Sequence, residues 1–156
     1  MATINATLSV SSSDLSSNTL SLSKTMTMTK AGTNTGLEFS SGLIRRKLTA
    51  TTEIDLIPTG AQVYGTPQAS DVTAGAAGKL YIKNTGSSST DYISVGLGDA
   101  TTPNELNDGT SKITLGHLYG GEWMLIPYHG KADVGDVLVA PSTAETTTVE
   151  WILFFE

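Results

Sequence analysis

The chain has 156 residues and a net charge of −6 at pH 7, with 17 serines, 24 threonines, two histidines and no cysteine. The absence of cysteine excludes a disulfide framework, a thiolate nucleophile, a zinc ribbon and an iron–sulfur cluster. The acidic balance argues against a general nucleic-acid-binding protein, and the lack of any run of about 18 apolar residues argues against a membrane span.

The N-terminal third is expected to be extended. Residues 3–10 alternate weakly between apolar and polar side chains, and residues 20–30 alternate clearly, with leucines and methionines on one face and hydroxyl residues on the other. A period of two predicts a strand. Lys24 interrupts the apolar face, which indicates an edge strand or a strand that lies on a partner. A second strand is predicted over residues 37–51, broken near Gly42.

The rest of the chain consists of short runs of β-forming residues separated by turn-forming residues, and no segment has sustained helical periodicity. One helical turn is expected at residues 102–105, where the order Thr-Pro-Asn-Glu has the form of a capping box. The strands predicted here cover residues 54–57, 61–64, 79–83, 92–97, 113–119, 122–128, 134–140 and 147–155.

Two pairs of these strands are expected to form hairpins. Residues 79–83 are expected to pair with residues 92–97. Residues 113–119 and 122–128 flank Gly120 and Gly121, and a two-residue Gly-Gly link between apolar runs is a hairpin signal.

The last strand, residues 147–155, carries apolar side chains on both faces. Val149, Trp151 and Leu153 share one face, while Ile152 and Phe154 share the other. A strand that is apolar on both faces is covered on both. The outer face therefore needs cover from a loop, the N-terminal arm or another subunit.

These patterns predict an all-β protein, an antiparallel β-sandwich of jelly-roll-like form with an extended N-terminal arm. The arm is assigned to residues 1–51 and the sandwich core to residues 52–156, as one structural unit.

The charge is unevenly distributed between these parts. Residues 1–47 hold five basic and two acidic residues, a net charge of +3, while residues 48–156 hold four basic and thirteen acidic residues, a net charge of −9. Arg45, Arg46 and Lys47 are therefore candidates for contact with an acidic surface, since complementary charge orients two partners. Two alternatives are open for these three residues. They could form a solvated strand end at a turn, or they could bind nucleic acid, although a region of this charge would neutralise few phosphates.

No catalytic constellation stands out. His117 and His129, together with Asp133 or Asp136 and the abundant serines, allow a Ser-His-Asp triad to be imagined, but no Gly-x-Ser-x-Gly elbow is present. We expect no catalytic residue, no enzymatic activity, no cofactor and no metal site.

Two binding alternatives stay open. Carboxylates in and before the loop at residues 97–109 could gather around Ca²⁺, although their spacing matches no calcium motif; they are Asp91, Asp99, Glu105 and Asp108. Trp123 and Trp151 could form a sugar platform, although tryptophan in a sandwich is more often part of the core.

Several segments resemble small virion proteins of tailed phages. They are Leu-Tyr-Ile-Lys-Asn-Thr at residues 80–85 with Tyr-Ile-Ser-Val-Gly-Leu at 92–97, the turn and strand at 118–127, and the closing strand at 149–156. The resemblance covers roughly residues 52–156, and Gly120 stands where the family often has proline. It implies capsid cement (decoration) proteins, or sometimes fibre and tail parts, built as β-sandwich subunits that are often trimers on the outer head lattice.

The resemblance and the residue patterns lead to one expectation: a phage capsid cement protein on the outer surface of the virion. Its partners would be the major capsid protein and further copies of itself in a trimer, with neither nucleic acid nor membrane involved. Arg45, Arg46 and Lys47 would meet the capsid, and subunits would contact through Met26, Met28, Ile152 and Phe154. The alternative is a fibre or adhesin module that binds carbohydrate through exposed aromatic rings such as Tyr64, Tyr119 or Tyr128.

Overall fold

The computed structural model describes eleven strands and no helix in the ranges it covers. Those ranges are residues 3–14, 20–30, 32–37, 39–49, 51, 53–57, 78–98, 113–128, 136–143 and 147–156. No helix in this part of the chain has the length and apolar character needed to cross a lipid bilayer. The prediction of an all-β protein is confirmed.

The strands in chain order are β1 (Asn5–Ser12), β2 (Leu20–Thr27), β3 (Phe39–Ser40), β4 (Ile44–Leu48), β5 (Ile54–Asp55), β6 (Gly78–Asn84), β7 (Tyr92–Gly98), β8 (Ile113–Tyr119), β9 (Trp123–Tyr128), β10 (Asp136–Pro141) and β11 (Thr147–Phe155). They form three sheets, and every pairing is antiparallel. Within the described residues β1 and β2 pair only with each other, as a hairpin. A four-stranded sheet has the order β5-β10-β7-β8, and a five-stranded sheet has the order β3-β11-β6-β9 with β4 also on β11.

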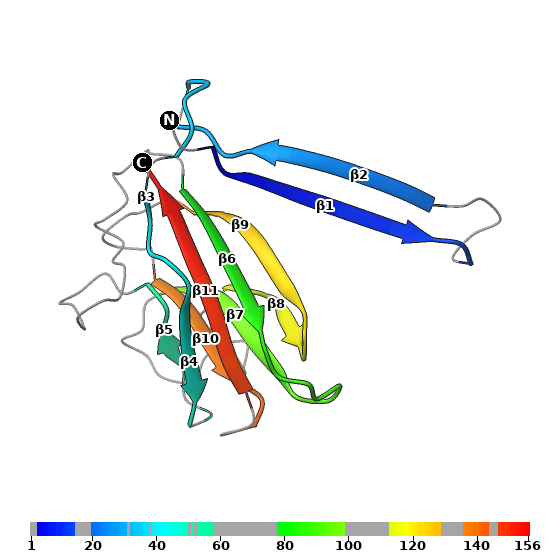
Figure 1. Cartoon of the computed structure of the whole chain (residues 1–156). Helices are drawn as coiled ribbons and strands as arrows, with labels where there is room; N and C mark the ends of the chain where they lie inside the picture. Colours follow the sequence, from blue (N-terminus) through cyan, green and yellow to red (C-terminus); the bar gives the residue numbers. More distant parts are fainter. Residues whose placement is uncertain are drawn as a thin grey trace.

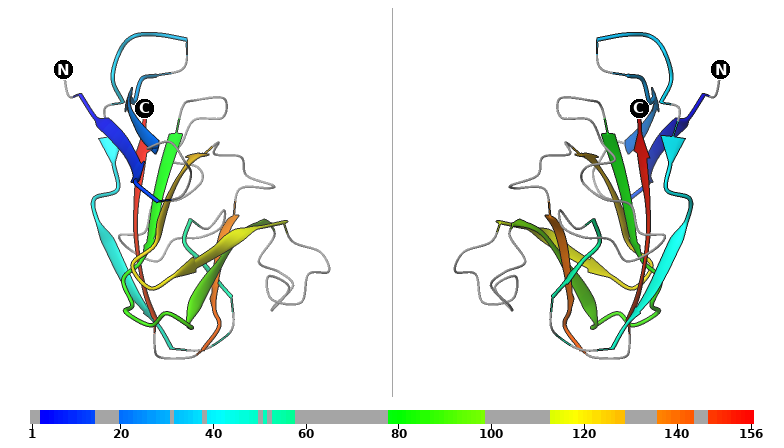
Figure 2. Two further views of the ribbon diagram at one scale, coloured as in Figure 1. Left: turned by 90° about the vertical axis from the view of Figure 1, so that its right-hand side faces the viewer. Right: turned by 90° about the vertical axis from the view of Figure 1, so that its left-hand side faces the viewer.

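The two larger sheets face each other, while the hairpin extends away from them (Figures 1 and 2). Alternate residues of β6 and β11 are buried, as a period of two requires when one face covers a core. The core between the sheets draws on both of them, and its fully buried members include Leu80, Ile82, Ile93, Val95, Val137, Val139, Val149 and Leu153. A core of this size lets the two sheets stabilise each other without disulfides.

Both predicted hairpins in the body are wrong. β6 lies in the five-stranded sheet, where its neighbours are β11 and β9, whereas β7 lies in the four-stranded sheet between β10 and β8. In the same way β8 and β9 belong to different sheets. Each connection therefore crosses from one sheet to the other instead of joining neighbouring strands.

A network of hydrogen bonds holds these two crossings against each other. The buried Asn84 side chain donates from Nδ2 to the Leu118 carbonyl at 2.9 Å and accepts from the Gly86 amide at 2.8 Å. The Gly120 amide donates to the Ser88 carbonyl at 3.1 Å, and the Gly121 amide donates to the Asn84 carbonyl at 3.0 Å. The turn that ends β8 is thereby fixed on the turn that ends β6.

The strand predicted over residues 37–51 is present as β3 and β4, with the predicted break at Gly42, whose φ of 71° favours glycine. Both strands pair with β11, so the five-stranded sheet includes residues from the segment assigned to the arm as well as from the segment assigned to the core. The strand predicted at residues 61–64 and the helical turn at 102–105 lie outside the described residues.

Candidate interaction surface

The β1–β2 hairpin has two chemically distinct faces. The register aligns Leu8 with Lys24, and Val10 with Leu22, on one face. We call this the apolar face of the hairpin, and it comprises Ala6, Leu8, Val10, Leu20, Leu22 and Met26 around Lys24. The opposite face carries hydroxyl and amide groups, with the Thr7 and Thr25 hydroxyls 3.0 Å apart. The two-faced strand predicted at residues 20–30 is confirmed over Leu20–Thr27, where β2 ends.

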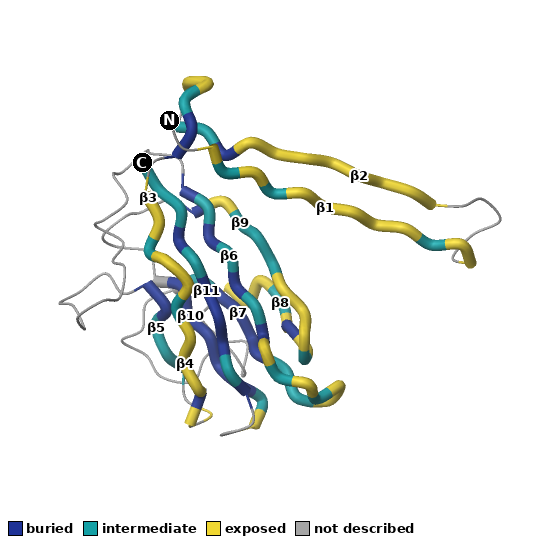
Figure 3. Tube along the Cα trace, viewed as in Figure 1, coloured by how far each residue is buried: buried dark blue, intermediate teal, exposed yellow. Residues whose placement is uncertain are grey.

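Both strands of the hairpin are exposed along most of their length (Figure 3). Leu8 is 46% exposed and Met26 is 42% exposed. A two-stranded hairpin is marginally stable by itself, and full burial of one such side chain contributes about 1.5–3 kcal/mol. Covering this face would therefore stabilise the hairpin considerably.

The outer face of the five-stranded sheet also carries apolar side chains. The register places Ile152 beside Tyr81 and Tyr81 beside Leu125. The rings of Tyr81 and Trp123 pack with their centroids 6.1 Å apart, and Trp123 is 49% exposed. Partial burial and, to a lesser degree, the nearby Glu150 carboxylate raise the pKa of Tyr81, so its phenol stays neutral and able to donate a hydrogen bond.

A groove of about 280 Å³ lies between the hairpin and strand β9. We call it the hairpin–β9 groove; its lining is Ala6, Leu8, Lys24, Thr25, Met26, Trp123 and Leu125. One wall is therefore the apolar face of the hairpin and the other is the outer face of β9. Sequence reasoning identified the first wall by its alternation but gave no indication that β9 lies opposite.

The four predicted subunit-contact residues have different environments. Met26 lines the hairpin–β9 groove. Ile152 and Phe154 are half-buried on β11, two strands away from β9 in the same sheet. Met28 is only 3% exposed, and its backbone is bonded to Ile4 and Leu37. Because its own chain already covers Met28, its side chain is not available at the surface.

The three predicted capsid-contact residues lie on β4, at the margin of the five-stranded sheet. Successive side chains of a strand point to opposite faces, so Arg46 points away from the side shared by Arg45 and Lys47. Arg45 Nε donates to Glu150 Oε2 at 2.7 Å, and Glu150 is 8% exposed. Arg45 is thus engaged within its own chain, while cationic side chains along an edge also discourage strand pairing with other molecules.

Replacing Arg45 with alanine is expected to lower the free energy of unfolding by about 1–2 kcal/mol, because a largely buried carboxylate loses its charged donor. Arg46→Ala is the matched control, since Arg46 is exposed on the same strand, and it is expected to change the stability by less than about 0.5 kcal/mol. Chemical denaturation of both variants measures the difference. Equal stability of the two variants would show that the ion pair with Glu150 is energetically neutral.

Among the residues considered for a Ser-His-Asp triad, one serine and one histidine are in contact. His117 Nδ1 lies 3.1 Å from the Ser94 hydroxyl, and the His117 ring packs on Tyr92 with centroids 4.3 Å apart. Ser94 is fully buried, so its hydroxyl is closed to a substrate. His129 and Asp133 lie outside the described residues, as does the Asp136 side chain. The Ser94–His117 pair follows from the β7–β8 register, which the sequence does not specify.

The aromatic candidates do not form a common platform. Trp151 is 3% exposed in the core, whereas Trp123 lies on the outer face of the sheet. Tyr119 is 39% exposed but meets Tyr92 edge-on at 62°, and Tyr128 is buried. Tyr64 lies outside the described residues.

The calcium candidates can be followed only in part. Asp91 accepts a hydrogen bond from the Thr143 hydroxyl at 3.3 Å. Asp99, Glu105 and Asp108 fall outside the described ranges, and within those ranges no three His, Asp or Glu side chains gather in an arrangement suited to a metal ion.

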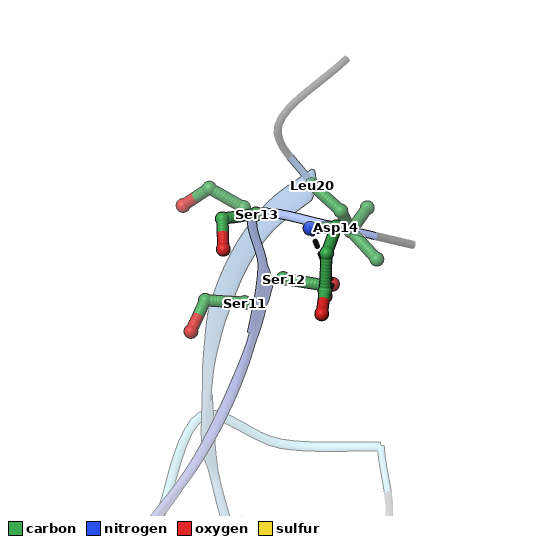
Figure 4. A pocket seen from close by; sticks show the side chains of 6 residues that line it. Ser11, Ser12, Ser13, Asp14 and Leu20 are labelled. Atoms are coloured by element: carbon green, nitrogen blue, oxygen red, sulfur yellow. Dashed lines mark hydrogen bonds between the residues drawn. The ribbon is translucent and has the colours of Figure 1, made fainter. Parts of the chain in front are cut away.

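A second hollow, of about 470 Å³, lies at the far end of the hairpin (Figure 4). It is lined by serines, Leu20 and Asp14, and the Ser12 hydroxyl donates to Asp14 Oδ1 at 2.9 Å. A single carboxylate that already has a local partner gives this hollow no reactive group. The hairpin–β9 groove is therefore the candidate functional site. No protein-family model, curated protein or solved structure matches the chain.

Proposed function

We propose that the protein is a virion structural protein, a capsid cement (decoration) protein that binds the outer surface of a tailed-phage head and bridges capsid subunits to stabilise the shell. The observation that carries the proposal is the hairpin, which extends from the two-sheet body and exposes apolar side chains such as Leu8, Leu22 and Met26. Exposed apolar faces of this kind are typical of contacts between proteins.

The strand orders support a jelly roll as the finer fold class. From β4 onward the chain changes sheet at nearly every connection, which leaves β4-β11-β6-β9 in one sheet and β5-β10-β7-β8 in the other. A double-sheet jelly roll of eight strands has this alternation, and it is an architecture of viral capsid proteins. The hairpin takes the place of the proposed N-terminal arm.

In the proposed mechanism the hairpin and the β4 margin both contact the major capsid protein. Arg46 and Lys47 are exposed and would meet acidic groups of the shell, whereas Arg45 is engaged with Glu150. The subunits would form a trimer, since closed rotational symmetry limits assembly to a fixed number of copies. Of the proposed subunit-contact residues, Ile152 and Phe154 are available on the outer face of β11, whereas Met26 lines the hairpin–β9 groove. No cofactor takes part.

Binding to shells that lack the protein tests this function. The purified chain should co-sediment with such shells and saturate at a fixed ratio to the capsid protein, and the shells should then resist heat better. The doubly substituted Arg46→Glu, Lys47→Glu chain should bind several-fold more weakly at low salt, and less so at high salt. A wild-type chain that leaves the shells unbound at micromolar concentration would refute the proposed function.

The oligomeric state is tested separately by the mass of the chain in solution. We expect the mass of a trimer at micromolar concentration. A mass of one subunit across that range would refute a preformed trimer, although it would leave binding to the shell intact.

A fibre or adhesin module that binds carbohydrate is the second candidate. The half-exposed ring of Trp123 beside Tyr81 favours it, since aromatic rings with exposed faces stack on sugars. A glycan array would then show binding that Trp123→Ala abolishes. An array without binding, together with attachment to shells, would exclude this candidate.

A further inference from the structure

We propose that the hairpin–β9 groove binds an extended segment of another protein, one in which apolar side chains flank a carboxylate that pairs with Lys24. The inference deepens the proposed function, because it states the chemistry of the partner segment that the hairpin recognises. It rests on the lining of the groove, the position of Lys24 and the open edge of β9.

The groove walls determine that the occupant is largely apolar. Leu8, Met26, Trp123 and Leu125 line it, and the first three of these side chains are strongly exposed without an occupant. Filling the groove removes apolar surface from water on both walls at once.

Lys24 determines the charge of the occupant. It lies within the apolar face of the hairpin, opposite Leu8, and the described residues provide it with no hydrogen bond or ion pair. An occupant that covers the neighbouring side chains also takes the ammonium group out of water. That step is costly unless an opposite charge meets it, so the occupant requires a carboxylate at this point.

The β9 edge determines that the occupant is extended. Within the described part of the chain β9 pairs only with β6, so its other edge has no strand partner there. A strand added to such an edge gains main-chain hydrogen bonds, while its alternate side chains enter pockets. Pro127 has no amide hydrogen, which confines this pairing to the first part of β9.

A second copy of the chain fits the groove poorly. Its hairpin would bring another Lys24, and the neighbouring outer face of the sheet already carries Lys83 beside Trp123. Glu150 on the outer face of the sheet is paired with Arg45, while Asp14 and Glu122 accept hydrogen bonds from the Ser12 hydroxyl and the Tyr119 amide.

Three short peptides provide the test: alternating valine and threonine with a central Glu, Gln or Lys. Trp123 fluorescence reports binding, since the other tryptophan, Trp151, is buried, and Trp123→Phe should remove the signal. We expect the Glu peptide to bind wild type about tenfold more tightly than the Lys peptide. Lys24→Glu should reverse this order. Lys47→Glu, on the distant β4 strand, should leave the order unchanged.

The outcomes separate this inference from the proposed function. Equal affinity for the three peptides, or no binding of any of them by a chain that still attaches to shells, would overturn the acidic-segment inference alone. If the chain discriminates between the peptides but does not attach to shells, the cement function is refuted and the inference about the groove still holds. Self-association that Leu8→Ser with Met26→Ser abolishes, in the absence of peptide binding, would identify a second copy as the occupant and also overturn the inference.

Discussion

Replacing Gly120 with alanine is expected to lower the free energy of unfolding by about 1–3 kcal/mol, because the added methyl group has no space. An alanine Cβ at this position would lie 2.5 Å from the Ser88 carbonyl oxygen and 2.8 Å from the Gly86 carbonyl oxygen. Both are backbone atoms, so they cannot move aside as a flexible side chain would. The substitution also disturbs the hydrogen bond from the Gly120 amide to Ser88.

Gly116 provides the matched control for this experiment. It lies on β8, four residues earlier in the same strand and turn, and an alanine Cβ there meets no atom within 4 Å. Gly116→Ala should leave the stability unchanged or raise it by up to about 1 kcal/mol, through the lower entropy of the unfolded chain. Urea denaturation of both variants gives the comparison. A Gly120→Ala chain as stable as the Gly116→Ala chain would contradict the close packing of the two crossings.

The same turn shows why the sequence pattern predicted the two hairpins of the body wrongly. Gly120 and Gly121 lie between two apolar runs, and this pattern indicates a tight turn, which is present. It does not specify whether the second run pairs with the first or crosses to the facing sheet, because both arrangements have the same alternation. The choice depends on distant partners, since β9 pairs with β6 and β8 pairs with β7.

The alternation of residue types within a single strand predicts burial correctly, unlike the choice of strand partners. In β11 it separated the buried Trp151 and Leu153 from the half-buried Ile152, and in β2 it identified the apolar face of the hairpin. Burial follows directly from a period of two when one face meets a core. The wall that β9 adds to the groove and the engagement of Arg45 by Glu150 depend on which strands are neighbours, and this information is not local.

The amides of the hairpin are expected to exchange hydrogen about a thousandfold faster than those of β6 and β11 in the isolated protein. β6 and β11 each have strand neighbours on both sides and buried side chains, so their amides open only by global unfolding. In the described part of the chain β1 and β2 have only each other as strand neighbours, and they expose most of their side chains. Local opening costs far less than global unfolding, and every 1.4 kcal/mol of the difference is a factor of about ten in rate.

Attachment to shells should then slow exchange specifically in the hairpin. Only amides that bond across the β1–β2 ladder should be compared, since outward amides exchange freely in either state. If the apolar face of the hairpin becomes covered, these amides should approach the protection of the body, while those of β6 remain unchanged as an internal control. Full protection in the isolated chain would mean that the chain itself holds the hairpin. The apolar face would then contribute to the stability of the fold and would not be evidence of an interface. The main support for a binding role would be lost.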